Sequence, residues 1–111
     1  MANTFVNKKV DLTSTSATTL YTVPSATTAI IKSILVSEDS GNADTITVKV
    51  TNSSNTNISH IASTINVPAD TTLELAGASK IVLEATEKLR ATGGAASGDL
   101  EAFVSVLEID N

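Results

Sequence analysis

The sequence predicts an all-β fold, an antiparallel β-sandwich of jelly-roll type with eight or nine short strands. Apolar residues alternate with polar ones over short runs, as they do on strands that turn one face toward a core. Clusters of Gly, Pro, Ser, Asn and Asp interrupt these runs about every 8–12 residues, a spacing typical of sandwiches. The segment whose residue types most favour a helix, 87–92, is too short to form a stable one.

The first run, residues 3–12, places Val6 and Val10 on one face and polar residues on the other. Lys8 interrupts the apolar face near its middle. This pattern predicts a half-exposed edge strand, and residues 1–16 as a whole are interpreted as an N-terminal edge strand or arm.

The chain is organised around residues 20–36, which are interpreted as a strand, a tight turn and a second strand. Pro24 lacks a backbone N–H, so the first strand must stop or turn there. Residues 29–36 are almost entirely apolar and rich in β-branched side chains, as expected of a strand covered on both faces. The two strands are expected to form a central hairpin.

The later runs are expected to form further strands. The run 45–51 alternates most cleanly, and the run 58–67 places Ile61, Ile65 and Val67 on one face. In 87–92, Leu89 and Ala91 are expected to point inward. The remaining strands are expected at 72–75, 80–85 and 99–109.

One short motif occurs twice. Val23-Pro-Ser-Ala-Thr-Thr28 matches Val67-Pro-Ala-Asp-Thr-Thr72, and each copy lies between two predicted strands. Proline presets the turn and the threonines favour a restart of extended chain. The repeat is either a trace of duplication or one turn solution used twice.

The composition indicates a single domain, residues 1–111, with an aliphatic core. Apolar residues make up 41% of the chain, charged residues 17% and aromatic residues only 3%. The net charge is −5 and the basic residues form no patch, which argues against nucleic acid and anionic membranes as partners. The absence of cysteine excludes disulfides, zinc knuckles and thiol catalysis.

The N-terminal residues lack the cationic start and apolar block of a secretory signal peptide, so we expect the protein to be made and folded in a cytoplasm. No apolar run approaches the ~18 residues of a membrane span.

No catalytic constellation is apparent. The lone histidine, His60, shares a predicted polar strand face with Ala62, Thr64 and Asn66, and is interpreted as a surface residue. The Ser and Thr residues form no nucleophile elbow, and no glycine-rich phosphate loop is present. Paired glutamates for glycosidase chemistry cannot be assembled from one sequence. We therefore expect no enzyme, no cofactor and no metal.

One loop could be interpreted as a metal site. Glu38, Asp39 and Asp44 flank a Gly-Asn turn, and hard oxygen ligands on a loop suit calcium. The spacing does not match an EF-hand. A solvated hairpin loop is the default interpretation of residues 38–44.

The strands at 29–36 and 100–109 carry apolar residues on both faces, whereas a small sandwich buries one face of each sheet. Either loops or a second subunit must cover the other face. Because the loops are short and polar, a subunit interface is favoured. The residues expected to contribute to it are Val6, Val10, Phe103, Leu107 and Ile109.

The segment Leu20-Tyr-Thr-Val-Pro-Ser-Ala-Thr-Thr-Ala-Ile-Ile-Lys-Ser-Ile-Leu-Val36 resembles a pattern of small β-sandwich structural proteins of tailed bacteriophages, notably those that infect cyanobacteria. The loop Glu38-Asp-Ser-Gly-Asn-Ala-Asp44 and the strand Thr45-Ile-Thr-Val-Lys-Val50 continue the resemblance. It covers roughly residues 18–51, and the family has no catalytic residues to carry over.

The resemblance implies a virion protein that works by binding. As a capsid decoration (cement) protein it would bind the major capsid protein, often as a homo-oligomer such as a trimer, and stabilise the shell. A tail, neck or baseplate accessory protein is the alternative. A carbohydrate- or receptor-binding module, with loops 38–44, 52–57 and 93–98 as its binding end, is the alternative of another class.

Overall fold

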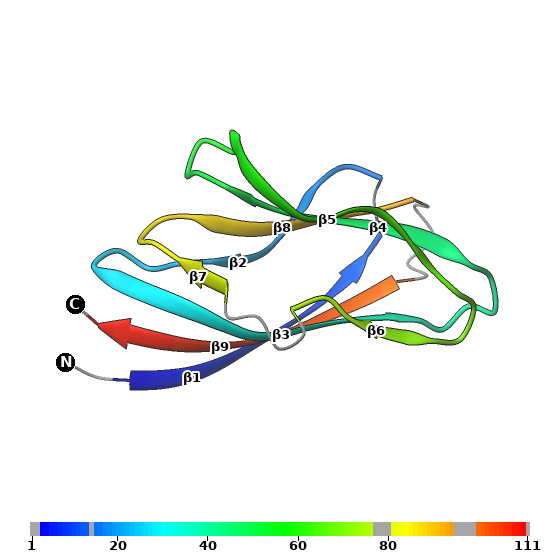
Figure 1. Ribbon diagram of the computed structural model, residues 1–111, viewed down its shortest axis with the longest axis horizontal. Helices are drawn as coiled ribbons and strands as arrows, with labels where there is room; N and C mark the ends of the chain where they lie inside the picture. Colours follow the sequence, from blue (N-terminus) through cyan, green and yellow to red (C-terminus); the bar gives the residue numbers. More distant parts are fainter. Residues whose placement is uncertain (1–2, 14, 77–80, 95–99, 111) are drawn as a thin grey trace.

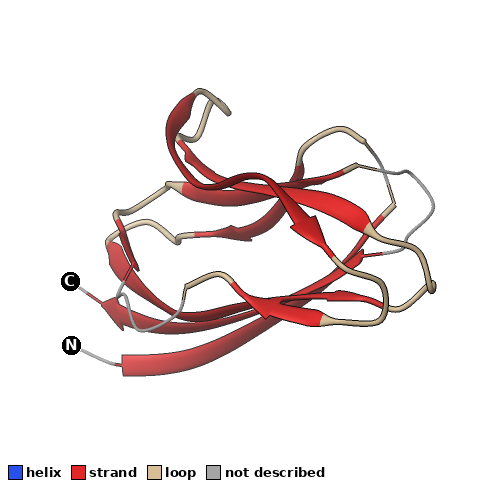
Figure 2. Ribbon diagram, turned by 45° about the vertical axis from the view of Figure 1, so that its right-hand side comes forward, coloured by secondary structure: helices blue, strands red, loops and turns tan. Residues whose placement is uncertain are grey.

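The computed structural model describes residues 3–13, 15–76, 81–94 and 100–110. Nine β-strands, and no helix, form in these residues. The strands make two antiparallel sheets that pack face to face as two layers (Figures 1 and 2). The all-β sandwich predicted from the sequence is confirmed.

Sheet A has the strand order β1-β9-β3, and β6 and β7 pair one after the other with two different stretches of the free edge of β3. Sheet B has the order β2-β8-β4-β5. This is the order of a jelly roll, with one strand position divided between β6 and β7. The strands are β1 (Asn3–Leu12), β2 (Thr18–Thr22), β3 (Thr27–Glu38), β4 (Asp44–Thr51), β5 (Asn57–Val67), β6 (Thr72–Glu74), β7 (Ile81–Leu83), β8 (Lys88–Gly93) and β9 (Leu100–Asp110).

The expected central hairpin at 20–36 is wrong. β2 belongs to sheet B and β3 to sheet A, so the chain crosses the sandwich at Pro24 and does not fold back on itself. The backbone of Val23 pairs with another connection instead: its N–H donates to the Glu87 carbonyl at 2.9 Å, and its carbonyl accepts from the Thr86 N–H at 3.0 Å. The loop 38–44 likewise connects strands of two different sheets, and not the two strands of a hairpin.

The repeated Val-Pro motif marks two such crossings. Both copies lead from sheet B to sheet A, and the first valine of each is buried. The fourth residue is left-handed in both, with φ of 55° at Ala26 and 56° at Asp70. The side-chain hydroxyl of the following threonine, Thr27 or Thr71, donates to a carbonyl of its own turn. The motif is therefore one corner geometry used twice.

This geometry predicts opposite effects of glycine at neighbouring positions. Ala26→Gly should raise the free energy of unfolding by about 0.5–1 kcal/mol, because relief of left-handed strain exceeds the added entropy of the unfolded chain. Ser25→Gly, the matched control one residue earlier, should lower it by a similar amount. Chemical denaturation measures both, and destabilisation by Ala26→Gly would contradict the assignment of strain.

The core is the aliphatic layer between the sheets. Inward residues of β4, β8 and β9 are almost fully buried, including the predicted pair Leu89 and Ala91. A polar link crosses this layer, because the Tyr21 hydroxyl of sheet B donates to Glu108 Oε2 of sheet A at 2.5 Å. Burial of the ring, together with the hydrogen bond and charge of Glu108, raises the pKa of Tyr21. The tyrosine therefore stays protonated and remains a donor.

β5 departs from the predicted alternation. Its pairing with β4 is interrupted three times, so its side chains do not keep a period of two. Val67 is buried as expected, but Ile65 is 41% exposed. Ala62, which the sequence placed on the polar face, is buried. The bulges account for both errors, because each extra residue reverses the faces of the strand beyond it.

β1 is an edge strand, as predicted, and it pairs with β9 in unbroken register over its whole length. Val6 and Val10 pack against the core from its inner face. Lys8 shares that face, opposite Val104, yet it is exposed at the sheet edge. Residues 3–12 are thus part of the sandwich of this chain.

A buried carboxylate fixes one end of the sandwich. Glu38 is only 2% exposed, and its oxygens accept from the Ser40 hydroxyl and from the backbone N–H groups of Ser40, Gly41 and Asp70. It therefore ties the β3–β4 loop to the second Val-Pro corner. Desolvation raises the pKa of Glu38, but the hydrogen bonds from Ser40, Asp70 and Gly41 outweigh it, so the pKa is lowered overall.

We expect Glu38→Gln to lower stability at neutral pH and to flatten the acid limb of the stability profile. A folded-state pKa below that of the unfolded chain gives stability above the unfolded pKa, which is lost as pH falls through the folded pKa. Thermal unfolding of both proteins from neutral to acid pH measures this. Parallel profiles would show that the ionisation of Glu38 does not cause the loss of stability in acid.

Candidate interaction surface

The five residues expected at an interface lie on two different sides of sheet A. Phe103, Leu107 and Ile109 point outward from β9 and are half-buried. Val6 and Val10 point inward from β1, toward the core. The structure therefore groups the three β9 residues on one surface and places the two valines elsewhere.

Leu107 is part of an apolar row that runs across sheet A. The register pairs Phe5 of β1 with Leu107, Leu107 with Ile30 of β3, and Ile30 with Val82 of β7. Directly opposed residues share one face of a sheet, so the four side chains form a continuous row. Phe5 is 78% exposed and Val82 is 56% exposed, which leaves both ends of the row open to solvent.

A second row lies further along the same face, and a polar row of Asn7, Ser105 and Ser33, next to a bulge at Lys32 in β3, separates it from the first. Lys9, Phe103 and Leu35 are opposed on β1, β9 and β3. The Lys9 ammonium lies over the Phe103 ring, 5.3 Å from its centre, in a cation–π contact. We call the two rows together the apolar face of sheet A: Phe5, Ile30, Val82, Phe103, Leu107 and Leu35.

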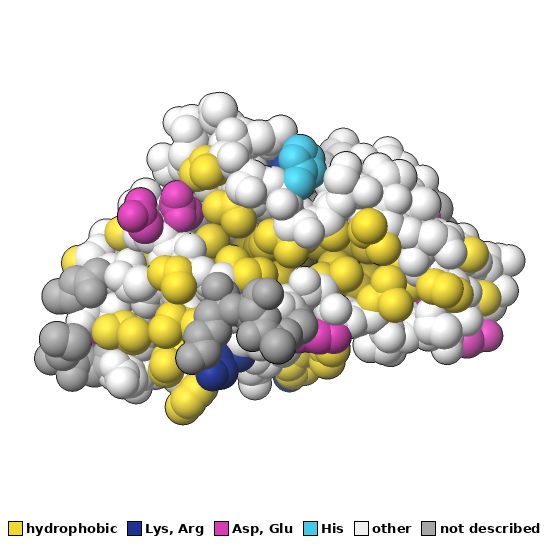
Figure 3. Space-filling view, in the orientation of Figure 1, with side chains coloured by type: hydrophobic (Ala, Val, Ile, Leu, Met, Phe, Trp, Pro, Cys, Tyr) yellow, Lys and Arg dark blue, Asp and Glu magenta, His cyan; other side chains and the backbone are white. Residues whose placement is uncertain are grey.

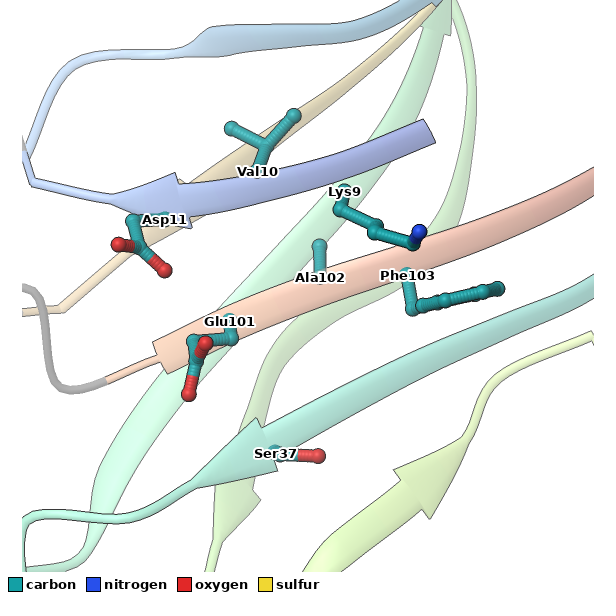
Figure 4. A pocket seen from close by; sticks show the side chains of 7 residues that line it. All are labelled: Lys9, Val10, Asp11, Ser37, Glu101, Ala102 and Phe103. Carbon is teal, nitrogen blue, oxygen red and sulfur yellow. The ribbon is translucent and has the colours of Figure 1, made fainter. Parts of the chain in front are cut away.

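An acidic group borders this face. Asp11, Glu101 and Ser37 line a shallow depression of about 370 Å³ next to Phe103. In Figure 4, Asp11 and Glu101 point to one side of their strands, whereas Val10 and Ala102 point to the other. A hydrogen bond and the charge of Asp39, and then the charge of Asp11, raise the pKa of Glu101.

Glu101→Gln should therefore stabilise the protein at neutral pH. Because the folded-state pKa of Glu101 is raised, its ionisation opposes folding, and stability is gained as pH falls through that pKa. Denaturant unfolding at neutral and mildly acid pH should show a gain that shrinks toward acid. A uniform gain at all pH values would contradict the carboxylate repulsion.

The loop considered for calcium uses most of its carboxylate oxygens otherwise. Both oxygens of Glu38 already accept hydrogen bonds, and Asp44 Oδ1 accepts from the Thr45 N–H at 2.7 Å, whereas Asp44 Oδ2 is buried without a hydrogen-bond partner among the described residues. Asp39 lies next to Glu101 instead. Across the described ranges, no group of three or more His, Cys, Asp or Glu side chains is placed to hold a metal ion.

The outer face of sheet B is polar. Thr47 is opposed to Thr92, and Lys49 to both Arg90 and His60. Arg90 donates to the Thr19 hydroxyl at 3.2 Å and to the Ala17 carbonyl at 2.9 Å, so it is fixed within the chain. His60 is exposed, as predicted. The two outer faces of the sandwich therefore differ in polarity: that of sheet A carries apolar rows, and that of sheet B is polar.

The three loops expected to form one binding end do not lie together. Gly94 donates to the Thr45 carbonyl at 3.0 Å, which places the start of the third loop beside loop 38–44 at the N-terminal end of β4. Loop 52–57 follows the C-terminal end of that strand, at the opposite end of the molecule (Figure 1). Residues 95–98 lie outside the described part.

Sequence reasoning missed Phe5, Ile30 and Val82. In the sequence, Phe5 alternates with Val6 and Val10 and so belongs to the opposite face of the predicted strand, and Ile30 lies in a run that is apolar on both faces. These signals identify an apolar row only once the pairing of β1 with β9 is known, because that pairing joins residues from the two ends of the chain.

No helix in the described residues is long and apolar enough to cross a membrane. Comparisons with known protein families and with curated proteins found no match to this chain.

Proposed function

We propose that this protein is a non-enzymatic structural protein of a bacteriophage virion, most specifically a decoration protein that binds the capsid shell through the apolar face of sheet A. The observation that carries the proposal is the contrast between the two outer faces. One presents an uncovered apolar row, and the other presents Thr, Lys and Arg. A molecule with this asymmetry has one side suited to a neighbour and one suited to solvent.

The energetics favour binding at many equivalent positions. A fully buried Phe, Leu, Ile or Val side chain contributes about 1.5–3 kcal/mol. Association of two proteins costs about 4–15 kcal/mol before any net affinity appears. A row of four such side chains, already partly shielded, gives a weak single contact. Linked copies in a homo-oligomer, such as a trimer on the major capsid protein, multiply that contact into stable binding.

Fold and sequence add independent support. Jelly rolls form many viral capsid proteins as well as lectins, although a fold alone does not decide between them. The resemblance over residues 18–51 favours the virion. The separation of the loops and the aromatic content of 3% weigh against a carbohydrate- or receptor-binding module.

The test is binding to purified capsids of the phage that encodes the protein. Phe5→Asp and Leu107→Asp should each reduce binding at least about tenfold, because each buries a charge in the contact. Both residues point out of the sheet, so the fold should persist. Thr92→Asp, which adds the same charge to the outer face of sheet B, is the matched control and should bind normally.

Electron microscopy of the virion locates the protein directly. Copies distributed over the head are expected. Copies confined to the tail, neck or baseplate would replace decoration with the accessory role, and a chain absent from purified virions would overturn the proposal altogether. Capsid binding unaffected by Phe5→Asp and Leu107→Asp would remove the apolar face as the contact.

A further inference from the structure

We propose a second binding site: the groove between β5 and β7 takes an extended segment of a partner protein, with apolar side chains in the groove and a Lys or Arg beside Glu84 and Glu87. This groove lies at the open side of the sandwich, where sheet B ends at β5 and sheet A at β7. It adjoins the row centred on Leu107, because Val82 lines the groove and also ends that row, but Phe5 and Leu107 do not line the groove, so variants at those two positions test the sites independently.

The groove has a volume of about 560 Å³ and two apolar walls. Ile58 and Ile61 of β5 form one wall, and Ile81 and Leu83 of β7 form the other, with Val50 between them. Figure 3 faces this side and shows hydrophobic side chains across the middle of the molecule, between the layer with β5 and the layer with β6 and β7. On the opposite side of the sandwich, β1 and β2 lie against each other.

The backbone of β5 places both isoleucines in this groove. Val50 pairs with Ser59 and Thr51 with Asn57, so Ile58 is an extra residue without a partner on β4. Ile61 is likewise extra, between the pairs of Val48 and Lys49. A bulge redirects the side chain that it carries. Two bulges thus direct two large apolar side chains into one groove, and Ile58 remains 53% exposed there.

The charge at one end of the groove specifies the occupant. Glu84 and Glu87 line it together, and the Glu84 N–H donates to Glu87 Oε1 at 2.7 Å, which fixes the Glu87 carboxylate at the turn. Acidic side chains are visible at the left end of the apolar band in Figure 3. Two carboxylates beside an apolar groove complement a cationic residue flanked by apolar ones. An extended segment presents alternate side chains to one side and so matches both features.

The experiment uses the full chain and two short synthetic peptides that alternate Val or Ile with Thr. One begins with two lysines and the other with two glutamates. In NMR titrations the lysine peptide should bind, with shifts at Ile58, Ile61 and Ile81, and the glutamate peptide should bind at least about tenfold more weakly. Glu84→Lys should reverse this preference.

Ile58→Asp should abolish peptide binding, whereas Phe5→Asp, at an even more exposed apolar position on the other surface, should leave it intact. Each of the other outcomes overturns the proposal: no binding of either peptide, equal binding of both, or binding that survives Ile58→Asp. Self-association lost in Ile58→Asp would assign the groove to a second copy of this chain instead. None of these results depends on the capsid, so the fate of the decoration role is decided separately.

Discussion

The packing of aliphatic side chains between the two sheets is the interaction on which the structure depends. With few aromatic residues, the core is made of Ile, Val, Leu and Ala, and such side chains bury enough surface only when two complete faces meet. Most connections therefore cross from one sheet to the other, which the Val-Pro corners and the Glu38 carboxylate make possible. The jelly-roll strand order is the result of this alternation.

Because the core uses about every second residue of most strands, the outward residues are free to serve another purpose. They do so differently on the two sheets. Sheet A presents Phe5, Ile30 and Leu107 outward, whereas sheet B presents Thr, Lys and Arg. The outward apolar residues of sheet A lower the solubility of the protein and are not needed for folding. The surface chemistry that supports an assembly role is thus separable from the chemistry that folds the chain.

Local patterns in the sequence were sufficient for the strands and for most of their inward residues, such as Leu89 and Ala91. They were insufficient for pairing. A proline turn between two apolar runs fits a hairpin and a sheet crossing equally well, so residues 20–36 were misread. Bulges have no local signature, which explains the errors in β5, and the apolar row requires the long-range register of β1 with β9.

Lys8 limits how the molecule can grow. A lysine on the inner face of β1 is tolerated because its ammonium group reaches water around the border of the sheet. A further strand added beside β1 would enclose that charge in a dry interior, so sheet A cannot be extended on this flank into a continuous ribbon shared between molecules. The inward-pointing lysine therefore protects the free backbone groups of β1 from pairing with a strand of another molecule.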